Sequence, residues 1–185
     1  MLKAGDLRPL TDAGLLQLVV RMVMRSEPWC PLGGEASWRA AVDTIVGASA
    51  GQGVSLATAE AQGRALLDLG ARGARAGEAA HVWQARNQAA CVVDMGLRAA
   101  AAPLRKERWQ RVRDSAKHAA SIYALQAHAG RLAIDDAITI AWATIRADIP
   151  RLASAGSDRP TLSTLRSLAP LWPGREPAWA RPGHP

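Results

Sequence analysis

Alanine is the feature that most constrains the fold of this chain, since 39 of its 185 residues are Ala and none is Phe. Alanine has the highest helix propensity of the amino acids and is depleted in β-strands. One alanine in five residues therefore favours helices that pack closely through small side chains. We predict an all-α domain, a compact bundle of five to six helices in which Leu, Val, Ile and Trp supply the large core side chains.

Apolar periodicity and helix-capping residues locate these elements. The helices are predicted at residues 12–25, 36–47, 55–69, 78–101, 103–129 and 135–148. Pro150 is expected to end the last of them, because the residue before a proline is disfavoured in the helical conformation. We predict a helical domain over 1–150, followed in 151–185 by a short helix (162–168) and an extended or disordered Pro-rich tail.

The helix at 12–25 is apolar almost all round, with Arg21 as an interruption. A helix without a polar face is buried either in the core of its own domain or in an interface. The pattern therefore predicts a central core helix or a homodimer formed through helix 12–25, and it does not separate the two.

A glycine motif follows the second predicted helix. Gly47, Gly51 and Gly53 have the spacing Gly-x-x-x-Gly-x-Gly, which resembles the cofactor loop of short-chain dehydrogenases. The resemblance implies a dinucleotide pyrophosphate at a helix N-terminus. However, the chain before the motif has the pattern of helices, and the family's Tyr-x-x-x-Lys pair is absent, since Tyr123 is followed by Ala127. We therefore predict a helix–turn–helix connection and no cofactor.

Two carboxylate–histidine spacings occur on predicted helices, Glu78 with His81 and Asp114 with His118. A di-iron carboxylate site needs two Glu-x-x-His copies on facing helices, and the second copy is absent. We predict solvated side-chain pairs at both positions and no metal site.

The cysteines, Cys30 and Cys91, are the candidate nucleophiles. A catalytic thiol needs a nearby base and a lowered pKa. Cys91 lies ten residues from His81 on one predicted helix, too far for direct contact, and Cys30 lies in a loop between prolines, which specifies no base. We expect buried, structural thiols and assign no catalytic residue.

The strongest functional pattern is the basic stretch of the helix at 103–129. Arginine and lysine neutralise phosphates or carboxylates, and an indole can stack on a base. The candidate residues for binding an anionic partner are Arg105, Lys106, Arg108, Trp109, Arg111, Arg113 and Lys117. The alternative is an ordinary exposed face. Its opposite side, which turns inward, then carries Leu104, Val112, Ala116, Ala119 and Tyr123.

The C-terminal residues carry the second functional pattern. Five prolines fall within residues 170–185, and Trp172 and Trp179 stand among them. Tryptophans on a proline-stiffened segment can bind a partner or cover an apolar surface of the chain's own domain.

The net charge and the targeting patterns of the chain limit the range of possible functions. Lys and Arg outnumber Asp and Glu by 23 to 16, giving a net charge of +7. No signal peptide or membrane-spanning stretch is evident, so we expect a bacterial-type cytoplasmic protein with free thiols.

The leading functional hypothesis is a non-catalytic interaction module, an adaptor, regulator or inhibitor that binds a protein partner. The alternatives are a nucleic-acid-binding protein that uses helix 103–129, and an enzyme whose active site converges from separate helices.

Overall fold

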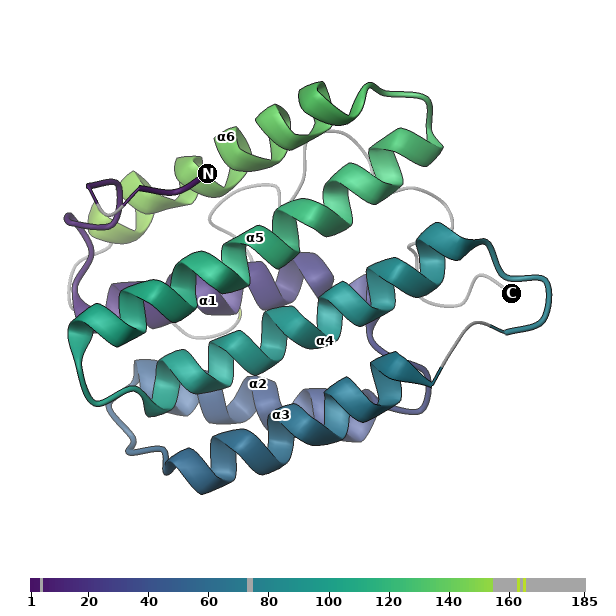
Figure 1. The fold of residues 1–185 in the computed structure, drawn as a ribbon. Helices are drawn as coiled ribbons and strands as arrows, with labels where there is room; N and C mark the ends of the chain where they lie inside the picture. Colours follow the sequence, from purple (N-terminus) through teal and green to yellow (C-terminus); the bar gives the residue numbers. More distant parts are fainter. Residues whose placement is uncertain (4, 73–74, 155–162, 164, 166–185) are drawn as a thin grey trace.

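The computed structural model describes residues 1–3, 5–72, 75–154, 163 and 165, and these residues contain α-helices and no strand (Figure 1). The elements are α1 (Asp12–Ser26), the 3₁₀ turn η1 (Glu27–Trp29), α2 (Glu35–Ser49), α3 (Leu56–Ala71), α4 (Ala80–Ala101), α5 (Arg105–Ala129) and α6 (Ile134–Ser154). The predicted all-α class is confirmed. Most of the predicted short helix at 162–168 lies outside the described residues.

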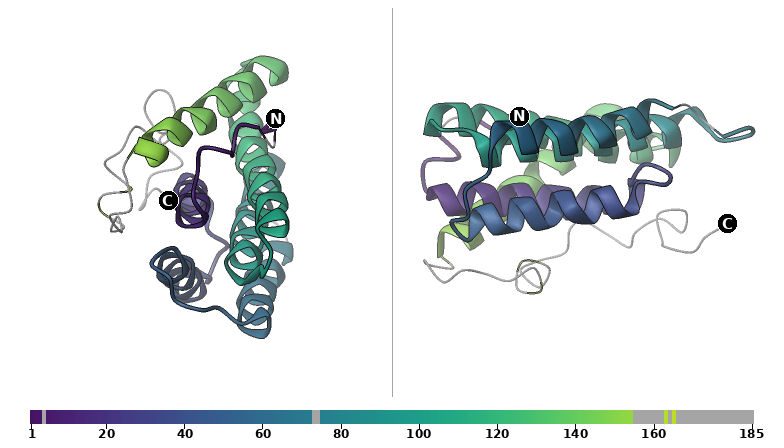
Figure 2. Two further views of the ribbon diagram at one scale, coloured as in Figure 1. Left: turned by 90° about the vertical axis from the view of Figure 1, so that its left-hand side faces the viewer. Right: turned by 90° about the horizontal axis from the view of Figure 1, so that it is seen from below.

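The helices form two layers with α6 along one edge. Figures 1 and 2 show α3, α4 and α5 side by side in one layer, with α1 and α2 behind them. The last helix, α6, lies beside α5 and also contacts α1. None of the helices in the described ranges is both long enough and apolar enough to cross a membrane.

Helix α1 is the centre of the bundle. Every residue from Gly14 to Ser26 is buried. Thr11 begins the helix as its N-cap, since its side chain accepts a hydrogen bond from the Gly14 N–H. Of the two alternatives for this segment, the structure shows the central core helix. The other alternative, a homodimer formed through helix 12–25, finds no exposed side chain between Gly14 and Ser26.

A buried ion cluster joins α1 to α6. Arg21 and Arg25, on successive turns of α1, both contact the Asp148 carboxylate of α6, and all three side chains are at most 1% exposed. Arg21 Nη2 lies 3.1 Å from Asp148 Oδ1, and Arg25 Nη1 lies 2.6 Å from Asp148 Oδ2. Arg21 Nη1 also donates to the Leu165 carbonyl at 2.7 Å. Burial lowers the pKa of Arg25, and the Asp148 carboxylate opposes that shift.

Pro150 does not end α6, so the predicted end at residue 148 is wrong. The helix continues to Ser154 and crosses the predicted boundary between 150 and 151. Pro150 is exposed, whereas Ile149 and Leu152 are buried. We infer that their burial offsets the lost backbone hydrogen bond, which costs about 3 kcal/mol in a helix interior. The Arg151 guanidinium donates to the Ala147 carbonyl at 2.8 Å, in the turn that the proline disturbs.

The glycine motif forms the C-terminal cap of α2. Gly51 has φ +94°, the Gln52 N–H bonds to the Gly47 carbonyl, and the Gly51 N–H bonds to the Ala48 carbonyl, each at 3.0 Å. These two bonds and a glycine with positive φ define a Schellman motif. The predicted helix–turn–helix connection is confirmed.

One carboxylate of α4, that of Asp94, is buried. Asp94 is 3% exposed, and it accepts hydrogen bonds from Arg98 Nε at 3.0 and 3.2 Å. The adjacent helix α3 presents Gly63 to Asp94, and no side chain separates them. A carboxylate can be buried here because the arginine on the next turn of α4 pairs with it.

A glycine of α4, Gly96, allows α4 to approach α1 and α2 closely. A Cβ added at Gly96 would lie 2.6 Å from Val19 Cγ1 and 3.0 Å from Ile45 Cδ1. Both neighbours are fully buried, so they have little room to move.

We predict that Gly96→Val lowers the free energy of unfolding by about 3 kcal/mol, at the upper end for overpacked cores. Urea denaturation measures the change. Gly53→Val is the matched control, because a Cβ at Gly53 meets nothing within 4 Å. Equal losses in the two variants would contradict the close approach of α4 to α1.

We also predict that Asp148→Asn lowers the free energy of unfolding by roughly 3–5 kcal/mol, because two buried guanidiniums lose their carboxylate. The control is Asp136→Asn, which removes an exposed carboxylate from the first turn of the same helix. A loss no larger than that of the control, again in urea denaturation, would show that the ion cluster does not hold α6 in place.

Candidate functional site: the face formed by α5 and α6

Two of the predicted anion-binding residues, Arg105 and Arg108, make contacts within the protein. Both form ion pairs with Asp12 at the start of α1, the one from Arg108 Nη1 at 2.6 Å. Arg105 also donates to the Leu10 carbonyl, and Arg108 donates to the carbonyls of Ala99 and Ala102 at 3.1 and 2.9 Å. These guanidiniums therefore connect the start of α5 to the start of α1 and the end of α4.

The inward face predicted for the basic helix is confirmed at Val112, Ala116 and Ala119, which are fully buried. It is wrong at Leu104, which is 60% exposed. Leu104 is the residue before α5 rather than part of it, since the helix begins at Arg105 and not at the predicted residue 103.

The remaining basic residues lie on two different surfaces. Arg111 lines a hollow beside α3 together with Glu60, Arg98 and Glu107. The others line a cleft of about 480 Å³ on the outer side of α5, which we call the basic cleft. Its lining residues are Lys106, Trp109, Gln110, Arg113, Asp114 and Lys117.

The basic cleft has an excess of positive charge. Lys106 is exposed and Lys117 is 47% exposed. Arg113 Nε donates to the Leu2 carbonyl at 3.0 Å, and Lys117 Nζ lies 2.7 Å from the Asp114 carboxylate. Three cations thus face one carboxylate. The structure brings together four of the seven predicted residues here, namely Lys106, Trp109, Arg113 and Lys117.

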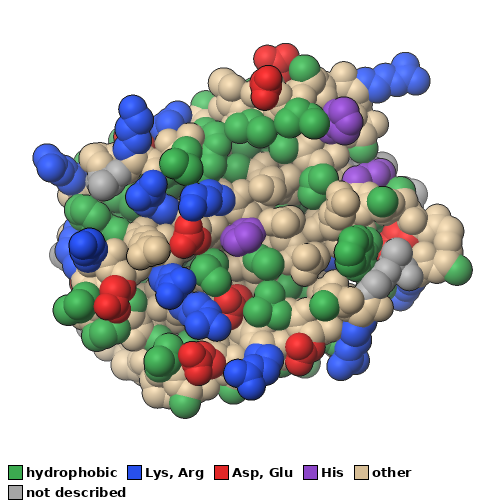
Figure 3. Space-filling model, in the orientation of Figure 1, with side chains coloured by type: hydrophobic (Ala, Val, Ile, Leu, Met, Phe, Trp, Pro, Cys, Tyr) green, Lys and Arg blue, Asp and Glu red, His purple; other side chains and the backbone are tan. Residues whose placement is uncertain are grey.

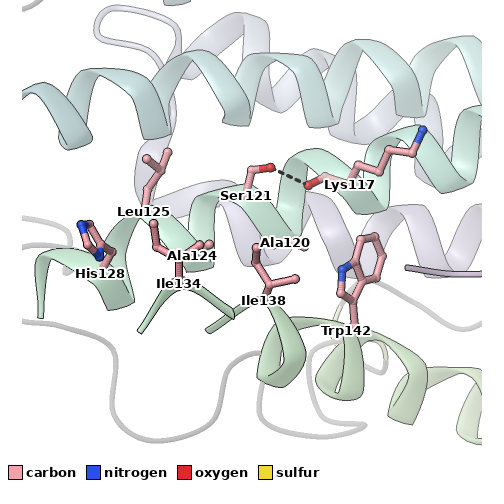
Figure 4. A pocket seen from close by; sticks show the side chains of 9 residues that line it. All are labelled: Lys117, Ala120, Ser121, Ala124, Leu125, His128, Ile134, Ile138 and Trp142. Atoms are coloured by element: carbon pink, nitrogen blue, oxygen red, sulfur yellow. Dashed lines mark hydrogen bonds between the residues drawn. The ribbon is translucent and has the colours of Figure 1, made fainter. Parts of the chain in front are cut away.

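An apolar groove of about 400 Å³ lies between α5 and α6, and we call it the α5–α6 groove (Figure 4). The α5 side is formed by Lys117, Ala120, Ser121, Ala124, Leu125 and His128. The α6 side is formed by Ile134, Ile138 and Trp142. Figure 3 shows hydrophobic side chains gathered along the line between these two helices.

The groove exists because the side chains on the two walls differ in size. The α5 wall carries Ala120, Ser121 and Ala124 in its middle, opposite the large side chains of α6. Ile134 is 48% exposed and Ile138 is 37% exposed, while Trp142 is 8% exposed. Small residues on one helix leave a hollow that the isoleucines on the other do not fill.

The two ends of the α5–α6 groove differ in charge. In Figure 4, Lys117 and Trp142 lie at one end and His128 and Ile134 at the other. Lys117 also lines the basic cleft, so the groove and the cleft meet at this residue. At the other end, the first turn of α6 carries the exposed carboxylates of Asp135 and Asp136.

The histidine of one carboxylate–histidine spacing and the carboxylate of the other contact different side chains from those predicted. His118 Nδ1 lies 2.7 Å from the Gln88 Oε1 of α4, and burial lowers the pKa of His118. Glu78 forms an ion pair with Arg86 rather than with His81. Within the ranges that the structure describes, no three His, Cys, Asp or Glu side chains gather in a way that could hold a metal ion.

Both cysteines are free and half-buried. Burial raises the pKa of Cys30 to about 12, with Glu35 and Glu27 adding to the shift. Burial also raises the pKa of Cys91, and the charge of the Asp94 carboxylate adds to this shift. These environments disfavour the thiolate that nucleophilic catalysis needs.

Most residues of the groove were not predicted as a site. Of its nine lining residues, only Lys117 belongs to the predicted set, and the predicted tail residues Trp172 and Trp179 lie outside the described residues. A signal was present in the spacing of Ile134, Ile138 and Trp142, which recur every four residues on one helix face. Comparison with protein-family models, curated proteins and solved structures finds no match to this chain.

We predict that Cys30 resists alkylation in the native protein. At about pH 8, its raised pKa leaves roughly a thousandfold less thiolate than an ordinary cysteine has. Iodoacetamide labelling, followed by peptide mass spectrometry, compares native protein with protein unfolded in guanidinium. Similar labelling rates in the two states would contradict the assigned environment.

Proposed function

We propose that this protein is a non-catalytic interaction module that binds a helical segment of a protein partner in the α5–α6 groove. The observation that supports this most is the spacing of the groove residues. The α5 wall follows the pattern i, i+3, i+4, i+7, i+8, i+11 from Lys117 to His128, and the α6 wall follows i, i+4, i+8 from Ile134 to Trp142. Two parallel stripes of this kind are what a third helix packs against.

The dimensions of the groove suit a short helix. Residues 117–128 span about 16 Å at 1.5 Å per residue, or about three helical turns. Amphipathic helices that bind in grooves use anchor residues at i, i+3 or i+4, and i+7, which fit this length. A bound helix would cover the exposed parts of Ile134 and Ile138 and so remove apolar surface from water.

Catalysis has little support on this surface. Ser121 Oγ donates to the Lys117 carbonyl at 2.9 Å, a bond within its own helix. Ser121 and His128 are seven residues apart on α5, or about 10 Å along its axis, too far for a nucleophile–base hydrogen bond. The groove therefore offers apolar contact rather than an activated nucleophile.

Nucleic-acid binding is the second candidate function. The basic cleft favours it, since Trp109 lies between Lys106 and Arg113 in the lining. Against it, Arg105, Arg108 and Arg113 are already bonded within the protein, which leaves fewer cations for phosphates. Phosphate binding also gives no role to the apolar groove.

The docking function predicts that Ile138→Asn strongly reduces partner capture. Full-length protein immobilised on beads is incubated with an extract of the cells that produce it, and captured proteins are quantified by mass spectrometry. A specific partner should be reduced by about tenfold or more on the variant, because a polar amide replaces an apolar contact in the groove.

The matched control is Leu56→Asn, which changes another exposed apolar residue, on α3. It should capture the partner as well as the unchanged protein does. Both sites are exposed, so urea denaturation should show similar stability for the two variants. If the Ile138→Asn variant captured the partner as well as the unchanged protein does, the docking function would be overturned.

A further inference from the structure

Resting on the docking function above, we propose that the partner segment is an acidic amphipathic helix. Its apolar face fills the α5–α6 groove, and its carboxylates lie at the Lys117 end, where the groove meets the basic cleft.

The charge of the surface favours an acidic partner. At the Lys117 end, the basic cleft offers Lys106, Arg113 and Lys117 against the single carboxylate of Asp114. Lys117 is 47% exposed although it pairs with Asp114, so its ammonium remains accessible to a second carboxylate. A partner whose acidic residues follow its apolar face would place them over these cations.

The charges at the other end of the groove determine the orientation expected for the partner helix. Asp135 and Asp136 are exposed in the first turn of α6, and His128 ends the α5 wall. A carboxylate placed there would meet like charges. The acidic residues of the partner are therefore expected in the half of its helix that lies near Trp142 and Lys117, and not in the half near Ile134.

The charge of the basic cleft also favours a separate partner over the chain's own C-terminal residues. Residues 166–185 carry Arg166, Arg175 and Arg181 and a single acid, Glu176. That segment has the same sign of charge as the basic cleft. A second copy of the chain would place one hollow against another in a two-fold contact, which leaves the space in both unfilled.

Three labelled peptides of about 18 residues test the inference. All share one apolar face of Leu and Ile at helical spacing, and the polar positions in one half carry Glu, Gln or Lys. Fluorescence anisotropy measures their binding to the full-length protein at about 50 and 200 mM salt, a range over which exposed charge pairs are increasingly screened.

The Glu peptide should bind about tenfold more tightly than the Gln peptide at the lower salt, since each exposed ion pair contributes modestly. The Lys peptide should bind more weakly than either, and the differences should shrink at the higher salt. Lys106→Glu combined with Lys117→Glu should reverse the order. Arg39→Glu, an exposed charge change on α2, should leave it unchanged.

Equal binding of the three peptides, lost on Ile138→Asn, would overturn the acidic partner and leave the docking function standing. Binding of none would also overturn the inference, and the capture experiment then reports independently on docking. Peptide binding that appears only after Trp172→Ala and Trp179→Ala would assign the groove to the chain's own tail.

Two further results would overturn the proposal in favour of other occupants. A dimer in light scattering that Ile138→Asn dissociates would assign the groove to a second copy. A single-stranded RNA or duplex DNA oligonucleotide that displaces the Glu peptide, and whose own binding depends on Lys106 and Lys117 but not on Ile138, would assign the surface to nucleic acid.

Discussion

The contact between Asp148 and the two arginines of α1 is the interaction on which the rest of the structure depends. Arg21 and Arg25 lie in the middle of the most buried helix, where an unpaired guanidinium would be very costly. Asp148 is the residue of α6 that contacts both of them. The α6 helix is therefore fixed by a directional, buried ion cluster with α1, and not by its apolar residues alone.

This constraint explains why the α5–α6 groove stays open. Helices that pack only through apolar contacts can slide until hollows close, but α6 must keep Asp148 within hydrogen-bond distance of α1. The opposing wall on α5 has Ala120, Ser121 and Ala124, which are too small to reach Ile134 and Ile138. A hollow between a fixed helix and a wall of small residues is a suitable place for a side chain from another molecule.

Local signals in the sequence predicted the helices well. Ser55 and Thr11 begin their helices as N-caps, and Gly51 ends α2, because each effect depends on a few neighbouring residues. The sequence failed where distant residues decide the outcome. Asp94 is polar yet buried where α4 meets Gly63 of α3, and Pro150 lies inside a helix whose flanking residues pack into the common core.

The candidate site shows the same division. The basic character of α5 is visible in the sequence. The ion pairs that Arg105 and Arg108 form with Asp12, which make these two residues less available to a partner, depend on how α1 and α5 meet. The groove likewise forms only where α5 and α6 face each other.

Hydrogen–deuterium exchange of the full-length protein, with and without the Glu peptide, tests whether a helix binds in the α5–α6 groove. We predict slower exchange in residues 117–128 and 134–142 and no change in α2 or α3, because a bound helix suppresses local opening. Protection confined to α2 and α3, or none on α5 and α6, would contradict it.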